Sequence, residues 1–177
     1  MMQTTDDGSY LDIDDRPAVR FERIYAHPVE RVWRAITDPA EMRHWFPSPE
    51  VEHEGRAGGT ITLAADPYSP EARTTRILVW EPPHRFSFQW ETDELHFTLR
   101  DHDGGCRLEL VNLLSTRGAG ARNSAGWEIC LGHLERVVAG TWQPSASDGG
   151  MEEFLPLLEK YRTLGVPDDG WLPDPPA

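Results

Sequence analysis

The stretch from Phe21 to Pro47, FERIYAHPVERVWRAITDPAEMRHWFP, restricts the fold more than any other part of the chain. Residues 18–26 alternate as a β-strand requires, which places Phe21 and Tyr25 on one face. Pro28 then suits the first turn of a helix. Four apolar residues follow it at helical spacing, namely Val29, Val32, Trp33 and Ile36. A strand therefore leads directly into an amphipathic helix.

A second, shorter helix follows at once. Asp38 suits its N-cap and Pro39 its first helical position. Pro47 stops the helix, because proline cannot continue the helical hydrogen bonds. The apolar side of this helix consists of Met42, Trp45 and Phe46. One strand followed by two short helices restricts the architecture before any active site is considered.

The next part of the chain alternates between apolar and polar residues. Phe86, Phe88 and Trp90 fall on one face of an expected strand, whereas Arg85 and Gln89 fall on the other. Short strands joined by tight turns predict an antiparallel meander with one buried face. The expected strands cover residues 51–54, 60–64, 74–80, 85–90, 95–101 and 106–114.

One longer helix has to cover that buried face. Residues 124–139 carry a broad apolar stripe and end at Gly140, and a Gly-rich loop is expected before them at 115–123. The sequence therefore predicts an α+β fold in which a helix packs on an antiparallel sheet. We expect an N-terminal tail with a short edge strand, one domain, and a C-terminal extension with a helix at about 154–164. The corresponding ranges are 1–16, 17–140 and 141–177.

Composition argues against several classes of function. The formal net charge of −13 is unsuited to nucleic acids, whose phosphates are neutralised by Lys and Arg, and to anionic membrane surfaces. No apolar run reaches the roughly 20 residues of a membrane helix, and the acidic N-terminus lacks the pattern of a signal peptide. We expect a cytoplasmic protein in which Cys106 and Cys130 are reduced and act as small buried hydrophobic side chains.

Several motifs together resemble the SRPBCC (START-like) superfamily. HPVERVWRAITDPAEMRHWFP is similar to the opening pattern of that superfamily, aP-x-x-x-VW-x-a-h-T-D-P-x-x-h-x-x-W. Further matches are Gly58-Gly59 before a strand, WEPPHRFSFQW at 80–90, and Gly126-Trp127 with Cys130-Leu131 and Leu134. Within the superfamily, residues 18–140 resemble the homologues of activators of heat-shock-protein ATPases. The resemblance implies the helix-grip fold, in which a curved antiparallel sheet wraps around a long C-terminal helix.

The same resemblance implies a ligand cavity between the sheet and the long helix. Its lining would come from residues on the inward faces, which are mostly apolar with a few polar groups. The alternative is that these residues only fill the core. The expected lining residues are Phe21, Arg23, Tyr25, Trp45, Phe46, Phe86, Phe88, Trp90, Leu95, Phe97, Leu108, Leu110, Asn112, Trp127, Leu131 and Leu134.

Polar residues give little sign of catalysis. Arg23 and Asn112 occupy inward-facing positions, where they either orient a ligand or satisfy other buried groups. His44 is expected near the mouth of the cavity. The sequence contains no nucleophile elbow, defensible acid–base pair or ligand spacing typical of a metal site. We therefore assign no catalytic residues and expect neither a metal nor a cofactor.

Three functions remain compatible with the sequence. The leading hypothesis is a binding protein for a small hydrophobic molecule. The second is a cyclase- or hydrolase-like enzyme using the same cavity, for which Arg23, His44 and Asn112 would have to converge. The third is a co-chaperone-like interaction module. Residues 1–16 are too short to replace the separate chaperone-binding domain of true activators, so a chaperone partner is not expected.

The tail helix is the remaining candidate interaction surface. Its apolar residues at helical spacing are Phe154, Leu157, Leu158, Tyr161 and Leu164. We expect this stripe to pack on its own domain, and a homodimer interface is the alternative.

Overall fold

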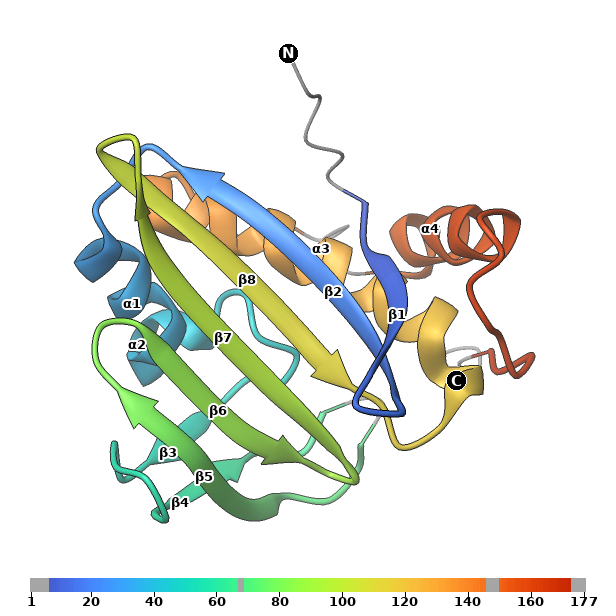
Figure 1. Ribbon diagram of the computed structural model, residues 1–177, viewed down its shortest axis with the longest axis horizontal. Helices are drawn as coiled ribbons and strands as arrows, with labels where there is room; N and C mark the ends of the chain where they lie inside the picture. The colour runs from blue at the N-terminus through green and yellow to red at the C-terminus, as the bar shows by residue number, and fades with distance from the viewer. Residues whose placement is uncertain (1–6, 67–68, 146–149, 173–177) are drawn as a thin grey trace.

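The fold is built on a single antiparallel sheet (Figure 1). The computed structural model describes residues 7–66, 69–145 and 150–172. In this part of the chain eight strands lie in the order β1-β2-β8-β7-β6-β5-β4-β3. Their bounds are β1 Ser9–Ile13, β2 Arg16–Tyr25, β3 Val51–His53, β4 Thr60–Leu63, β5 Arg73–Glu81, β6 Arg85–Trp90, β7 Asp93–His102 and β8 Gly105–Leu113.

Helices cover one face of this sheet. Figure 1 shows α3 behind the sheet, α1 and α2 together at one end of it, and α4 next to β1. The bounds are α1 Val29–Thr37, α2 Pro39–Met42, α3 Gly120–Ala139 and α4 Met151–Thr163, with a 3-10 turn η1 at Arg117–Ala119. The α+β helix-grip fold expected from the sequence is confirmed.

The strands from β3 to β8 form the predicted meander, and β1 lies at the sheet edge beside β2. Phe86 and Phe88 of β6 are fully buried and Phe97 of β7 is 1% exposed, whereas Arg85 and Gln89 are exposed. The rings of Phe86 and Phe88 lie 5.0 Å apart. The alternation in the sequence therefore identifies the core face of the sheet correctly, because successive side chains of a strand point to opposite faces.

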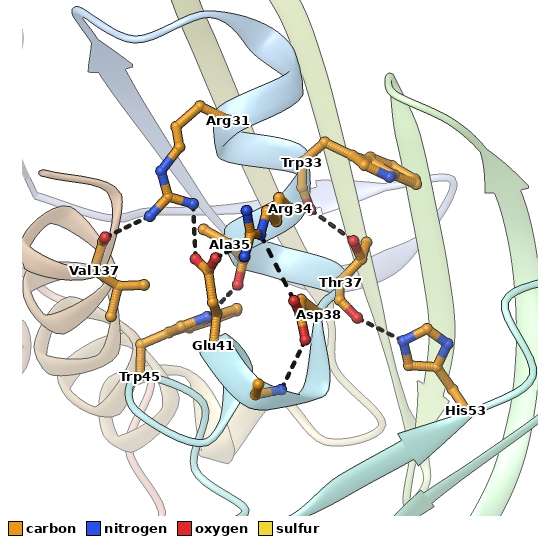
Figure 2. Close-up of polar contacts among 11 residues, drawn as sticks. Arg31, Trp33, Arg34, Ala35, Thr37, Asp38, Glu41, Trp45, His53 and Val137 are labelled. Atoms are coloured by element: carbon orange, nitrogen blue, oxygen red, sulfur yellow. Dashed lines mark hydrogen bonds and ion pairs between the residues drawn. The ribbon is translucent and has the colours of Figure 1, made fainter. Parts of the chain in front are cut away.

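Polar contacts fix α1 and α2 to their neighbours (Figure 2). The indole Nε1 of Trp45 donates to the backbone oxygen of Ala35 in α1 at 2.8 Å. Arg31 connects three helices, because its guanidinium lies 2.7 Å both from Glu41 of α2 and from the backbone oxygen of Val137 in α3. These bonds attach the loop after α2 to α1, and α1 in turn to α2 and to the long helix.

The long helix begins earlier than the sequence predicts. The expected loop at 115–123 contains η1, and α3 starts at Gly120. A Cβ at Gly120 would lie 3.0 Å from the side chain of Val166 and 3.2 Å from that of Tyr10. The glycine therefore permits close packing of the C-terminal segment instead of marking a turn. The prediction of a loop up to residue 123 is wrong for this reason.

The C-terminal helix packs on its own domain. Leu158 and Tyr161 of α4 are fully buried. The hydroxyl of Tyr161 donates to Glu128 of α3 at 2.7 Å and accepts the backbone N–H of Gly8 at 2.8 Å. Burial is the main cause that raises the pKa of the Tyr161 phenol, and the hydrogen bond to this carboxylate raises it further. Lys160 Nζ adds an ion pair to Glu128 at 2.7 Å, so α4 is attached to α3 by apolar and charged contacts together.

This helix also begins before its predicted start, at Met151, which places Pro156 inside it. Pro156 lacks the N–H that would bond to the backbone oxygen of Glu152. Both residues are exposed, so water can satisfy that oxygen. Within the ranges that the structure describes, none of the helices is long and apolar enough to cross a membrane.

Gly105→Ala is expected to destabilise the protein, because a Cβ at Gly105 would lie 2.1 Å from the backbone oxygen of Tyr25. The clash would separate β8 from β2 and lower the free energy of unfolding by about 1–3 kcal/mol. Gly132→Ala is the control, since Gly132 is exposed on α3 and its Cβ would meet open space. That change should stabilise the helix by up to about 1 kcal/mol. Urea denaturation measures both, and a G105A variant as stable as the wild type would contradict this packing.

Candidate functional site

A cavity of about 470 Å³ lies beside the N-terminal half of α3. The loop after α2, the turn between β6 and β7, and the residues that follow β8 form its inner walls. Phe154 of α4 and Trp171 contribute from the C-terminal part of the chain. The cavity therefore lies where the sheet, the long helix and the tail meet.

Aromatic rings form much of the inner wall. Phe46, Trp90 and Trp127 come from the loop after α2, the end of β6 and α3, and their ring centroids lie 5.3–6.1 Å apart. Phe46 is 5% and Trp127 is 2% exposed, whereas Trp90 is half-buried. Rings held this firmly offer a rigid apolar surface to a flat ligand.

A buried amide fixes the position of this wall. Asn112 on β8 is fully buried. Its Oδ1 accepts the indole N–H of Trp127 at 3.0 Å and the side-chain amide of Asn123 at 2.9 Å. Its Nδ2 donates to Asp93 at 3.2 Å. The amide is thus satisfied by groups from the turn and the helix, as buried polar groups require.

Asp93 completes the polar network from the turn between β6 and β7. Asp93 is the first residue of β7, and it pairs with Trp90, the last residue of β6. Its Oδ1 accepts the backbone N–H of Ser115 at 2.8 Å, and its Oδ2 accepts the side-chain amides of Asn112 and Asn123 at 3.2 and 3.3 Å. This carboxylate is half-buried and lines the cavity beside Trp90 and Trp127.

The outer wall comes from the C-terminal part of the chain. The rings of Phe154 and Trp171 meet edge to face, with centroids 6.3 Å apart. The guanidinium of Arg122 on α3 lies 5.4 Å from the ring centroid of Trp171 and forms an ion pair with Asp169 at 2.5 Å. A cation–π contact and an ion pair therefore hold the segment around Trp171 against α3.

The matched family agrees with this arrangement of an antiparallel sheet and a long C-terminal helix. The family model "Activator of Hsp90 ATPase homolog 1-like protein" matches residues 26–139. The chain belongs to this family. No curated protein matches the chain.

Solved structures share the fold of this family member. The crystal structure of CalU16 from Micromonospora echinospora is 25% identical, with a TM-score of 0.70 over 92% of this chain and 98% of that chain. EF2215 from Enterococcus faecalis, a conserved protein of unknown function, is 18% identical, with a TM-score of 0.65 over 89% of this chain and 91% of that chain. The protein encoded by BPP1335 of Bordetella parapertussis is 24% identical, with a TM-score of 0.61 over 92% of this chain and 93% of that chain.

The family match ends before the outer wall of the cavity begins. Phe154 and Trp171 both lie beyond residue 139, the last residue that the family model matches. The inner wall is therefore built on the scaffold of the activator-homologue family, whereas the outer wall depends on the C-terminal extension of this chain.

The structure divides the predicted lining residues into three groups. Trp45, Phe46, Trp90 and Trp127 line the cavity. Asn112 lies directly behind its wall, and Arg23 is half-buried on β2 with its guanidinium 5.5 Å from the ring centroid of Phe21. The others are buried in the packed core, namely Phe21, Tyr25, Phe86, Phe88, Leu95, Phe97, Leu108, Leu110, Leu131 and Leu134.

Among the wall residues that sequence reasoning missed are Asp93, Asn123, Phe154 and Trp171. Asn123 lies one helical turn before Trp127, a spacing that places both on one helix face, but the helix was expected to start only at residue 124. Asp93 follows Trp90 across a tight turn, which brings the two together as a cross-strand pair. Nothing in the local pattern connects Phe154 or Trp171 with the cavity, because their positions depend on how the tail docks.

The polar candidates named from the sequence do not converge in the cavity. Of the three polar candidates, His44 alone lines the cavity, and its ring lies 4.1 Å from that of Trp142. Burial raises the pKa of the Cys106 thiol to about 11 and that of the Cys130 thiol to about 12, so neither is a thiolate nucleophile near neutral pH. No group of three or more His, Cys, Asp or Glu side chains within the described ranges could hold a metal ion.

Asn112→Ala is expected to lower the free energy of unfolding by about 2–4 kcal/mol, because it leaves the buried indole N–H of Trp127 without its acceptor and creates a small void. Gln89→Ala is the matched control, since this amide is exposed on β6 and its loss should change stability by less than about 0.5 kcal/mol. Urea denaturation followed by tryptophan fluorescence measures both. Equal stability of the two variants would show that the Asn112 network does not hold α3 on the sheet.

Proposed function

We propose that this protein binds a small, largely apolar molecule with a ring system in the cavity beside α3. The observation that carries the proposal is a cavity of about 470 Å³ with a rigid aromatic wall and a few fixed polar groups. Small-molecule sites of proteins usually have a volume of about 300–1,000 Å³ and this mixed lining. Membership of the activator-homologue family supports a ligand-binding type of domain in general.

The packing of the cavity wall supports a flat ligand. Trp90 and Trp127 meet edge to face at 61°, and Phe46 lies 6.0 Å from Trp127. A ring placed against this wall gains apolar contact without requiring the side chains to reorganise, because buried rings already sit in fixed rotamers. The polar edge formed by Asp93 and Asn123 would then orient the polar end of the ligand.

Titration with 2-naphthylmethanol, a neutral flat probe, tests the proposal through the indole N–H signals in nitrogen–proton NMR spectra. The signals of Trp90, Trp127 and Trp171 should shift in a saturable manner, because these residues line the cavity. Trp33 and Trp80 provide an internal control, since their rings pack on each other at 5.2 Å and belong to a different part of the core. Unchanged cavity signals, or equal shifts for all five indoles, would contradict binding in this cavity.

Trp171→Ala is expected to weaken binding of the same probe by about twofold to tenfold, because one aromatic contact of the outer wall is worth about 0.5–1.5 kcal/mol. Leu172→Ala is the control, since the neighbouring Leu172 is 56% exposed and does not line the cavity. Calorimetric titration measures both variants. Equal affinity of W171A and L172A would mean that the outer wall does not contact the ligand.

A further inference from the structure

Charged side chains in the cavity wall are almost all paired within the protein. Arg122 forms its ion pair with Asp169. Asp66 and Glu91 both pair with Arg73, which lies behind them on β5. The other titratable polar side chains of the lining are the imidazoles of His44 and His133. Each of these charged side chains therefore has an opposite charge beside it, with Asp66 and Glu91 sharing one guanidinium, and one charged side chain of the wall is the exception.

The exception is the carboxylate of Asp93. Its hydrogen bonds come from the backbone N–H of Ser115 and the neutral amides of Asn112 and Asn123. All 17 Lys and Arg residues belong to the described part of the chain, and no ion pair joins any of them to Asp93. A carboxylate has about four acceptor positions, of which three are used here. One remains, on the oxygen that Ser115 contacts.

The surroundings of this carboxylate are those of a cation site. Asp93 lines the cavity together with Trp90, Trp127 and Phe46, and the π face of an aromatic ring attracts a positive group. A negative charge that is held by neutral donors and half removed from water gains from a cationic partner more than an exposed carboxylate does. An anionic ligand would meet this charge directly and would be repelled.

We propose that the ligand is an amine or other organic cation attached to an apolar ring system, and that Asp93 binds its positive group while the aromatic wall binds its ring. This inference deepens the proposed function and rests on it. It adds a chemical class, because burial of a ring against the aromatic wall does not by itself select the charge of the group attached to that ring.

Three probes of the same shape test the inference on the intact protein by calorimetric titration near neutral pH. They are 2-naphthylmethylamine, which is cationic, 2-naphthylmethanol, which is neutral, and 2-naphthoate, which is anionic. We expect the amine to bind about tenfold more tightly than the alcohol, a difference of about 1.4 kcal/mol, because its ammonium group adds a charge-assisted hydrogen bond to Asp93. The naphthoate should bind most weakly. Added salt should weaken binding of the amine and leave that of the alcohol unchanged.

Asp93→Asn removes the charge with little change in shape and should abolish the preference for the amine while retaining binding of the alcohol. Asp103→Asn is the matched control, because the side chain of Asp103 is 92% exposed and its φ of 47° suits Asn. Circular dichroism checks that both variants fold. If D93N is unstable, the comparison of the three probes on the wild-type protein still tests the preference for a cation, because that comparison needs no variant.

The outcomes separate the two proposals. If the wild-type protein binds the alcohol and the amine equally, or if D93N keeps the preference for the amine, the assignment of a cationic ligand is overturned and the binding function stands. If none of the three probes binds the wild-type protein, the proposed function fails, and the cationic assignment fails with it.

Discussion

The side-chain amide of Asn112 is the constraint around which the sheet, the turn and the long helix are arranged. Leaving such a group buried without partners would cost about 1–3 kcal/mol. Its partners come from separate elements, with Asp93 at the turn between β6 and β7 and Asn123 and Trp127 on α3. Satisfying one amide on β8 therefore fixes the rotation of α3 about its own axis and the position of the turn together.

The same constraint explains why the cavity lies at this end of α3 and not along its whole length. Further along the sheet, the inward face is filled by fully buried rings such as Phe86 and Phe88, which pack at 5.0 Å. Around Asn112 the amide itself and the side chains of Asp93 and Asn123 are polar, so close apolar packing there would leave hydrogen-bonding groups unsatisfied. The rings of Trp90 and Trp127 border this polar region and leave an open space with both kinds of surface.

Local patterns predict the scaffold well and the site only in part. Strict alternation at residues 85–90 and helical spacing after Pro28 identify the meander, both short helices and the buried faces, because these periods follow directly from backbone geometry. They also identify Trp90 and Trp127, which the structure places in the cavity wall. Local patterns do not distinguish inward-facing residues that line the cavity from those that fill the core. That difference depends on which side chains of the sheet contact side chains of the helices. Gly120 shows the limit, because close contact with Val166 requires it and a local pattern cannot reveal such a contact.

The two walls of the cavity are held by forces of different strength. The inner wall rests on buried rings and on hydrogen bonds that are buried or part-buried, whose loss costs several kcal/mol. Near Trp171, the outer wall depends on the half-exposed ion pair of Arg122 with Asp169 and on a cation–π contact, each worth about 1 kcal/mol or less in water. A ligand too large for the resting cavity would therefore displace the segment around Trp171 before it disturbed the sheet. Recognition of the ring would then depend on the scaffold that the family shares, whereas access to it would depend on the C-terminal extension.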